Sequence, residues 1–178
     1  MRSATPAEAP RLSRRAALLL VPLLITLHDA EEALAMPAAL RTLPARVPAW
    51  LAGMIPSYPR FLAALAVVTL LPWMVWLLGV ARRETHAGIV ALLLAQTVML
   101  VNVASHAGAA ILVRGYAPGV ATALALNLPF SLYLLRRAAR EGWLSRHALV
   151  LLGAAAVVVH GPGLLGLMWL AGRVAGAS

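Results

Sequence analysis

The stretch that decides the fold is AALLLVPLLITLHDAEEALAM, residues 16–36. It begins as an apolar run typical of a membrane helix. Its second half contains His28-Asp29-Ala30-Glu31-Glu32, an imidazole and three carboxylates within five residues. Each acid at bilayer depth costs roughly 2.5–3.5 kcal/mol on insertion scales. Such a cluster therefore needs compensating partners or a function, and the stretch predicts a membrane helix that carries a buried polar site.

The composition of the whole chain agrees with a membrane protein. Of its 178 residues, 62% are hydrophobic and 12% are charged, whereas soluble domains average about 25% charged residues. The mean hydropathy is +0.85. The chain has no cysteine, which excludes disulfides and thiolate metal sites. Its net charge of +9 comes from arginines that fall between apolar runs, which indicates membrane topology and argues against nucleic acid as a partner.

Four further apolar segments follow the first one. The five segments are about 16–36, 61–80, 87–113, 118–135 and 147–172. Each approaches the ~20 residues that cross a bilayer core, and only a helix satisfies the backbone of a single span. We therefore expect an all-α fold, one membrane domain over residues 1–178 with five transmembrane helices. The first helix should end at Pro37, and the proline-rich residues 37–59, with Trp50, should form an interfacial or partly re-entrant connection.

The arginines predict how the chain is oriented. The tail 1–15 and the loops after the second and fourth segments carry ten arginines, and the opposite side carries five. By the positive-inside rule the amino terminus is cytoplasmic and the carboxyl terminus lies outside. A signal peptide is the alternative for residues 11–35, with Ala33-Leu34-Ala35 as its cleavage site and the acids as its polar end.

Other segments contain polar side chains at depths compatible with the first cluster. Asn102 and His106 lie one helical turn apart, Asn127 is in the fourth segment and His160 in the fifth. At ~1.5 Å per residue, all of them fall between the midplane and the outer third of the membrane. We therefore expect one buried pocket, with functional atoms within roughly 3–5 Å of one another because unpaired charge is costly there. Asp29, about 100° around the helix from His28, need not face it.

These residue types favour two kinds of chemistry. Imidazole and carboxylate ligands together suit Zn²⁺ or non-haem iron. The candidate ligands are His28, Glu31, Glu32, His106 and His160, with Asn102 and Asn127 in supporting positions. Without a metal, acid–base catalysis would fall to Glu31, Glu32, His28 and His106. Two neighbouring carboxyl groups in a site without water have different pKa values, so one can act as the acid and the other as the base. A lipid-like or small apolar substrate would enter from the membrane.

Two other functions remain open at this point. Acids and histidines inside a membrane also mark ion pathways, which would make the protein a proton-coupled transporter, although the sequence contains no inverted repeat of the kind that carriers use. Alternatively, the polar groups only join helices through hydrogen bonds.

The order of the motifs resembles the HXXEE family of bacterial membrane proteins. The resemblance rests on His28-Asp29-Ala30-Glu31-Glu32, Asn102-x-x-x-His106, Tyr116-Ala117-Pro118-Gly119 and the stretch from Asn127 to Pro129, and it covers about residues 16–137. The family has no known function, so the resemblance implies no activity. It implies a multi-pass protein of the bacterial inner membrane, and it adds Tyr116, Pro118 and Gly119 to the positions of interest.

Overall fold

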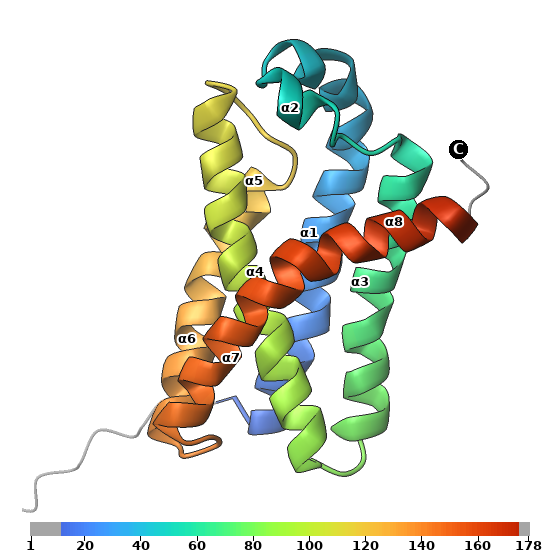
Figure 1. The fold of residues 1–178 in the computed structure, drawn as a ribbon. Helices are drawn as coiled ribbons and strands as arrows, with labels where there is room; N and C mark the ends of the chain where they lie inside the picture. Colours follow the sequence, from blue (N-terminus) through green and yellow to red (C-terminus); the bar gives the residue numbers. More distant parts are fainter. Residues whose placement is uncertain (1–11, 175–178) are drawn as a thin grey trace, which may run out of the picture.

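The fold, seen in a computed structural model that describes residues 12–174, is a bundle of five helical rods that run alternately up and down (Figure 1). The described residues contain no strand. The first three rods are α1 (Arg14–Thr42), α3 (Tyr58–Gly79) and α4 (His86–Leu112). The fourth joins α5 (Val120–Thr122), the π-helical turn η2 (Ala123–Asn127) and α6 (Leu128–Arg140). The fifth joins α7 (Arg146–Val158), the π-helical turn η3 (Val159–Gly163) and α8 (Leu164–Val174).

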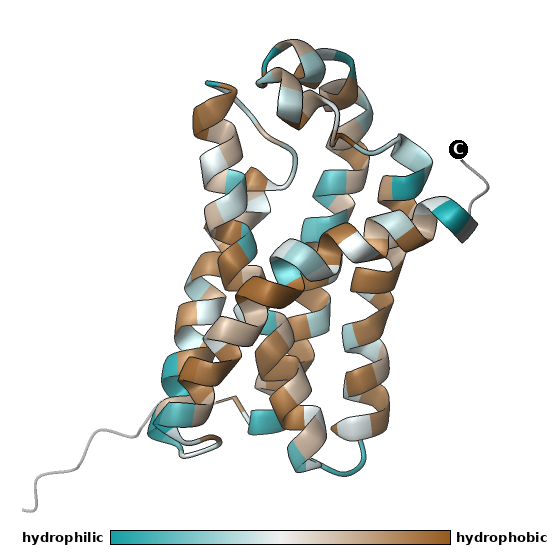
Figure 2. Cartoon of the chain, in the orientation of Figure 1, coloured by the Kyte–Doolittle hydropathy of each residue, from teal (hydrophilic) through white to brown (hydrophobic). Residues whose placement is uncertain are grey.

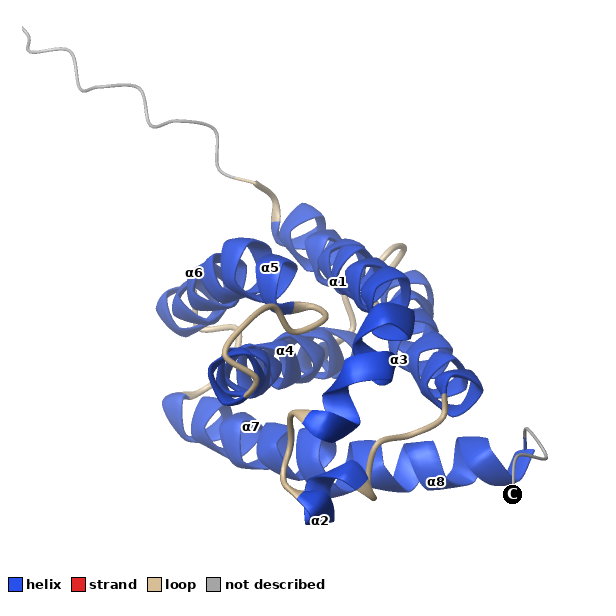
Figure 3. Ribbon diagram, turned by 90° about the horizontal axis from the view of Figure 1, so that it is seen from above, coloured by secondary structure: helices blue, strands red, loops and turns tan. Residues whose placement is uncertain are grey.

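Helix α4 is the centre of the bundle. It packs against α1, α3, α6 and α7, and the view from above shows these helices around it (Figure 3). The fifth rod crosses the others diagonally, so that α7 packs on α4 and α8 reaches α3. A cavity lies between α1, α3, α4 and this fifth rod, and the candidate site adjoins it.

Three of the rods are long and apolar enough to cross a membrane. They are α3, α4 and the continuous helix Arg146–Arg173. The prediction of five such helices is therefore only partly confirmed. Helix α1 carries His28, Asp29 and two glutamates in its second half, and α6 alone has 13 residues with Arg136 and Arg137 near its end. Figure 2 shows the difference, with hydrophobic colour along α3 and a hydrophilic stretch partway along α1.

The prediction that α1 ends at Pro37 is wrong, because the helix continues to Thr42. Proline has no backbone N–H, so it leaves the carbonyl of Ala33, four residues earlier, without its helical partner. The Tyr58 hydroxyl donates a hydrogen bond to that carbonyl at 3.0 Å. The connection that follows consists of the 3₁₀ turn η1 (Leu43–Ala45) and the short helix α2 (Ala49–Ala52), where Trp50 is exposed.

The apolar core fills the half of the bundle near the start of α1. Its members include Leu18 and Ile25 of α1, Leu92 and Leu93 of α4, and Leu134 of α6. At the same end, charged residues join the loops that close the bundle. They are Arg14 and Arg15, which pair with Glu84, and Arg137, which pairs with Glu141. These ion pairs close the core at this end. Of the predicted tail 1–15, residues 1–11 lie outside the described residues.

The partner of the Ala33 carbonyl gives a testable prediction for the fold. We expect Tyr58→Phe to lower the free energy of unfolding in mixed micelles by about 0.5–1.5 kcal/mol, the usual value of one hydrogen bond. In a Pro37→Ala background the restored backbone N–H can bond the same carbonyl, so Tyr58→Phe should then cost much less. An equal loss in both backgrounds would show that the hydroxyl does not compensate for the proline.

Candidate functional site

The side chains of the acidic motif on α1 contact three different helices because of their spacing along the helix. Residues four apart lie about 40° apart around a helix, so His28 and Glu32 share a face, while Asp29 and Glu31 lie to either side of it. His28 and Glu32 face α4, Asp29 contacts α3 through Thr69, and Glu31 contacts α5. The four side chains therefore do not form a single cluster, because they face three different helices.

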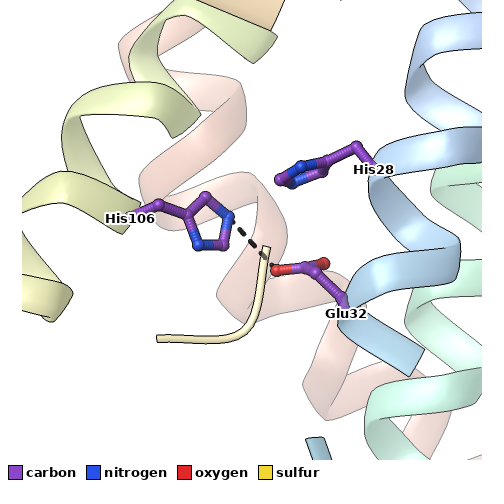
Figure 4. A group of neighbouring side chains, drawn as sticks. All are labelled: His28, Glu32 and His106. Atoms are coloured by element: carbon purple, nitrogen blue, oxygen red, sulfur yellow. Dashed lines mark ion pairs between the residues drawn. The ribbon is translucent and has the colours of Figure 1, made fainter. Parts of the chain in front are cut away.

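His28 and Glu32 meet His106 of α4 in a compact group (Figure 4). One ligand atom from each of the three residues lies within 4.8 Å of the others. His106 Nε2 is 3.2 Å from Glu32 Oε1, and the two imidazole rings stand edge to face with centroids 4.8 Å apart. Two histidines and one glutamate form a ligand set of catalytic zinc sites and, as two histidines with one carboxylate, of non-haem iron sites. The group could therefore hold a metal ion.

A chain of hydrogen bonds sets the orientation of the His28 ring. Thr122 Oγ1 donates to Glu31 Oε2 at 2.5 Å and lies 2.9 Å from His28 Nδ1. A hydroxyl has one proton, so when it donates to the carboxylate it accepts from Nδ1–H. His28 Nε2 is then the unprotonated nitrogen, and the Asn102 amide lies 2.8 Å from it. A hydrogen bond of this kind at one ring nitrogen selects the tautomer of a histidine.

Glu31 holds the loop before α5 against α1. Its carboxylate accepts hydrogen bonds from the Tyr116 hydroxyl at 2.5 Å, from the backbone N–H groups of Ala121 and Thr122, and from the Thr122 hydroxyl. Desolvation of the hydroxyl and its hydrogen bond to Glu31 raise the pKa of Tyr116 to about 12. Tyr116 therefore remains a proton donor to Glu31 at any physiological pH. Glu31 supports the group and is not one of its three members.

Gly119 lies directly over the three side chains. Its φ of +83° is in the left-handed region that favours glycine. A Cβ at this position would lie 2.7 Å from His106 Cε1, 2.8 Å from His28 Cε1 and 2.9 Å from Glu32 Cγ. No side chain fits in that space, so the backbone of the loop covers the group at van der Waals distance.

Three other predicted residues lie outside the group. His160 is in η3, with Nε2 2.9 Å from Ser105 Oγ. Asn127 is fully buried in η2, and neither polar atom of its side chain has a hydrogen-bond partner among the described residues. Asp29 faces α3, where its carboxylate accepts a hydrogen bond from Thr69 at 2.5 Å.

The hydroxyl partners were missed from the sequence. Thr69, Ser105 and Thr122 hold Asp29, His160 and His28 respectively. Threonine and serine are common in helices, where they usually bond the carbonyl of the preceding turn. The one signal in the sequence is that these hydroxyl residues occur in otherwise apolar segments.

A cavity of about 630 Å³ adjoins the group. It lies between α1, α3, α4 and the fifth rod, and its walls are mainly Leu, Val, Ala, Met and Pro side chains. Its polar lining residues are Asp29, Glu32, Asn102 and His160. Glu32 therefore borders both the cavity and the His28–His106 pair, which joins the two features into one site.

Comparison with known proteins gives one match. The family described as "Protein of unknown function with HXXEE motif" matches residues 19–134. Neither the curated proteins nor the solved structures gave a match. The matched residues include the three-residue group and the loop that covers it.

Gly119 provides a testable prediction for the geometry. Gly119→Ala should lower the thermal midpoint and weaken any Zn²⁺ binding by the group at least about tenfold, because the new methyl displaces His28 and His106. Gly142→Ala is the matched control, since Gly142 also has a positive φ (+66°) but nothing lies within 4 Å of its Cβ position. The control should show only the backbone strain of about 1–2 kcal/mol. Equal behaviour of the two variants in Zn²⁺ binding would contradict the close contact.

Proposed function

Since the chain belongs to the HXXEE family, whose function is unknown, we propose that it is a small integral membrane enzyme with a metal-binding site formed by His28, Glu32 and His106. The metal would be zinc or iron, and the substrate a lipid-like or small apolar molecule. The single observation that carries the proposal is the three-residue group itself, with ligand atoms within 4.8 Å of one another.

The surroundings of the group support a metal site over a simple ion pair. Ligands around zinc or iron bind at ~2.0–2.2 Å, so the three side chains need to move inward only slightly to share one ion. Thr122 already orients His28 through Nδ1, and a histidine whose second nitrogen is held by a hydrogen bond is typical of metal centres. The Asn102 amide, which lies 2.8 Å from Nε2, would turn away when that nitrogen binds an ion. Three protein ligands would leave a fourth position for water or substrate.

The adjoining cavity supports an apolar substrate. Binding sites for small molecules commonly measure ~300–1,000 Å³ and have apolar walls with a few polar groups, which describes this cavity well. A metal ion would supply Lewis-acid or oxidative chemistry at the Glu32 side of the cavity. Without a metal, Glu32 and His106 would act as an acid–base pair on the same substrate.

We also propose that the five alternating rods cross a bacterial inner membrane five times, with the cytoplasmic amino terminus that the distribution of arginines predicts. Helices α3, α4 and the fifth rod meet the length and hydropathy that a span requires. Helix α1 and the fourth rod would cross as well, because their polar side chains face protein neighbours: His28 and Asn127 are buried. Helix α1 is also continuous past Ala33–Ala35, where a signal peptidase would cut, which favours a retained span.

Two alternatives make different predictions. A structural protein would use the polar group only to join helices, so substitutions would change stability and nothing else. A proton-coupled transporter would move its ligand across the membrane, which uptake into proteoliposomes under a pH gradient would detect.

Metal content tests the proposed centre. We expect the protein, purified without chelator, to bind up to one equivalent of Zn²⁺ or Fe²⁺ per chain. His106→Ala and Glu32→Gln should abolish this binding. His147→Ala should not, because His147 is exposed and lies at the start of the fifth rod, away from the three-residue group. Atomic absorption and titration calorimetry measure both. A protein without metal that also takes up neither added ion would refute the metal centre, and thermal melts of the variants would then test the structural alternative.

Cysteine labelling tests the topology, and the chain has no native cysteine to interfere. Single cysteines placed at 82–86 and 138–145 should react with an impermeant maleimide only from the cytoplasm, and those at 41–50 only from outside. Labelling of both sets from the same side would overturn the five-span arrangement.

A further inference from the structure

The charge of the cavity wall is the feature that the proposed function does not use. Two of the four polar residues that line the cavity are acids, Asp29 and Glu32, and the other two are Asn102 and His160. No arginine of the described residues lines it, and the chain contains no lysine. A molecule inside the cavity would therefore meet carboxylates and no permanently cationic side chain.

Asp29 is the acid available to such a molecule. It is 4% exposed, and the hydrogen bond from Thr69 reaches only its Oδ2. A carboxylate can accept at both oxygens, so Oδ1 remains for a further donor. Glu32 differs, because it contacts His106 and belongs to the three-residue group. A buried carboxylate with one donor is costly in apolar surroundings unless another positive or donating group completes its shell.

We propose that the cavity binds a lipophilic cation, an amine or onium compound whose charged centre lies at Asp29 and whose apolar groups fill the space between α1, α3 and α8. The inference deepens the proposed function, since it names the chemical class of the substrate and rests on the cavity being the substrate site. It does not require that a metal be bound.

Charge complementarity favours a cation over other amphiphiles. An anionic headgroup, such as a phosphate or a fatty-acid carboxylate, would be buried beside Asp29 and Glu32 and would meet like charge with no arginine to offset it. A neutral hydrocarbon would gain apolar burial but would leave Asp29 without a second partner. A lipophilic cation satisfies the apolar walls and the acid together.

Two ions of nearly the same shape and opposite charge test the proposal. Tetraphenylphosphonium and tetraphenylborate differ mainly in the sign of their charge, and each is small enough for a cavity of about 630 Å³. Binding of each ion to the whole protein in uncharged detergent is measured by equilibrium dialysis, with and without a chelator. We expect saturable binding of tetraphenylphosphonium at one site per chain and no saturable binding of tetraphenylborate.

Variants assign the binding to the cavity. Asp29→Asn should weaken tetraphenylphosphonium binding at least about tenfold, as expected for loss of a buried charge partner. The control Glu84→Gln removes an acid that pairs with Arg14 and Arg15 outside the cavity, and it should have no effect. Val68→Trp places a large side chain in the cavity wall and should abolish binding while Asp29 is still present.

The outcomes separate this inference from the proposed metal centre. Tetraphenylphosphonium binding that survives chelation and the His106→Ala substitution supports the cation site even if no metal is ever found. If the wild-type protein binds the two ions equally and saturably, that result alone overturns the inference, whether or not any variant folds. If the Asp29→Asn variant is monodisperse and binds tetraphenylphosphonium with unchanged affinity, the inference is also overturned. Neither result bears on metal content.

Discussion

The contact between Glu31 and the loop at residues 116–122 is the interaction on which the rest of the site depends. One carboxylate of α1 accepts hydrogen bonds from a tyrosine hydroxyl, a threonine hydroxyl and two backbone N–H groups. These bonds hold Gly119 over the histidines and place Thr122 beside His28. Four donors converge on this one carboxylate, so the acid at position 31 fixes the position of a loop almost ninety residues later in the chain.

The cost of polar groups in apolar surroundings explains how the remaining residues are arranged. His28 lies between Thr122 and Asn102, and Asp29 is held by Thr69. His106 Nε2 lies 3.2 Å from Glu32 Oε1 at the edge of a large apolar cavity, and it has no hydrogen-bond partner among the described residues. Each of these four side chains thus contacts a residue of a different helix, and the same contacts that join the helices also fix the orientation of the group.

Irregular helix geometry occurs in the fourth and fifth rods. The two π-helical turns contain Asn127 and His160, and His160 lines the cavity. Such turns are frequent at functional sites because they re-aim side chains within a continuous helix. Pro37 is another local exception, since α1 continues through it and Tyr58 replaces the missing backbone hydrogen bond. Both features depend on neighbouring helices and could not have been inferred from local sequence.

By itself, the sequence determined the all-helical class, the family, and the presence of His28, Glu32 and His106 at compatible depths, because hydropathy and helical spacing are local properties. It also indicated the three helices that are long and apolar enough to cross a membrane, whereas α1 and the fourth rod, which it treated in the same way, do not meet that length and hydropathy. Only the tertiary structure separated Glu31 from Glu32 and assigned one to a loop and the other to His106. The reason is that residues one apart on a helix face directions about 100° apart, and which neighbour each direction meets depends on how the helices pack. The hydroxyl partners and the acidic cavity wall follow from that packing alone.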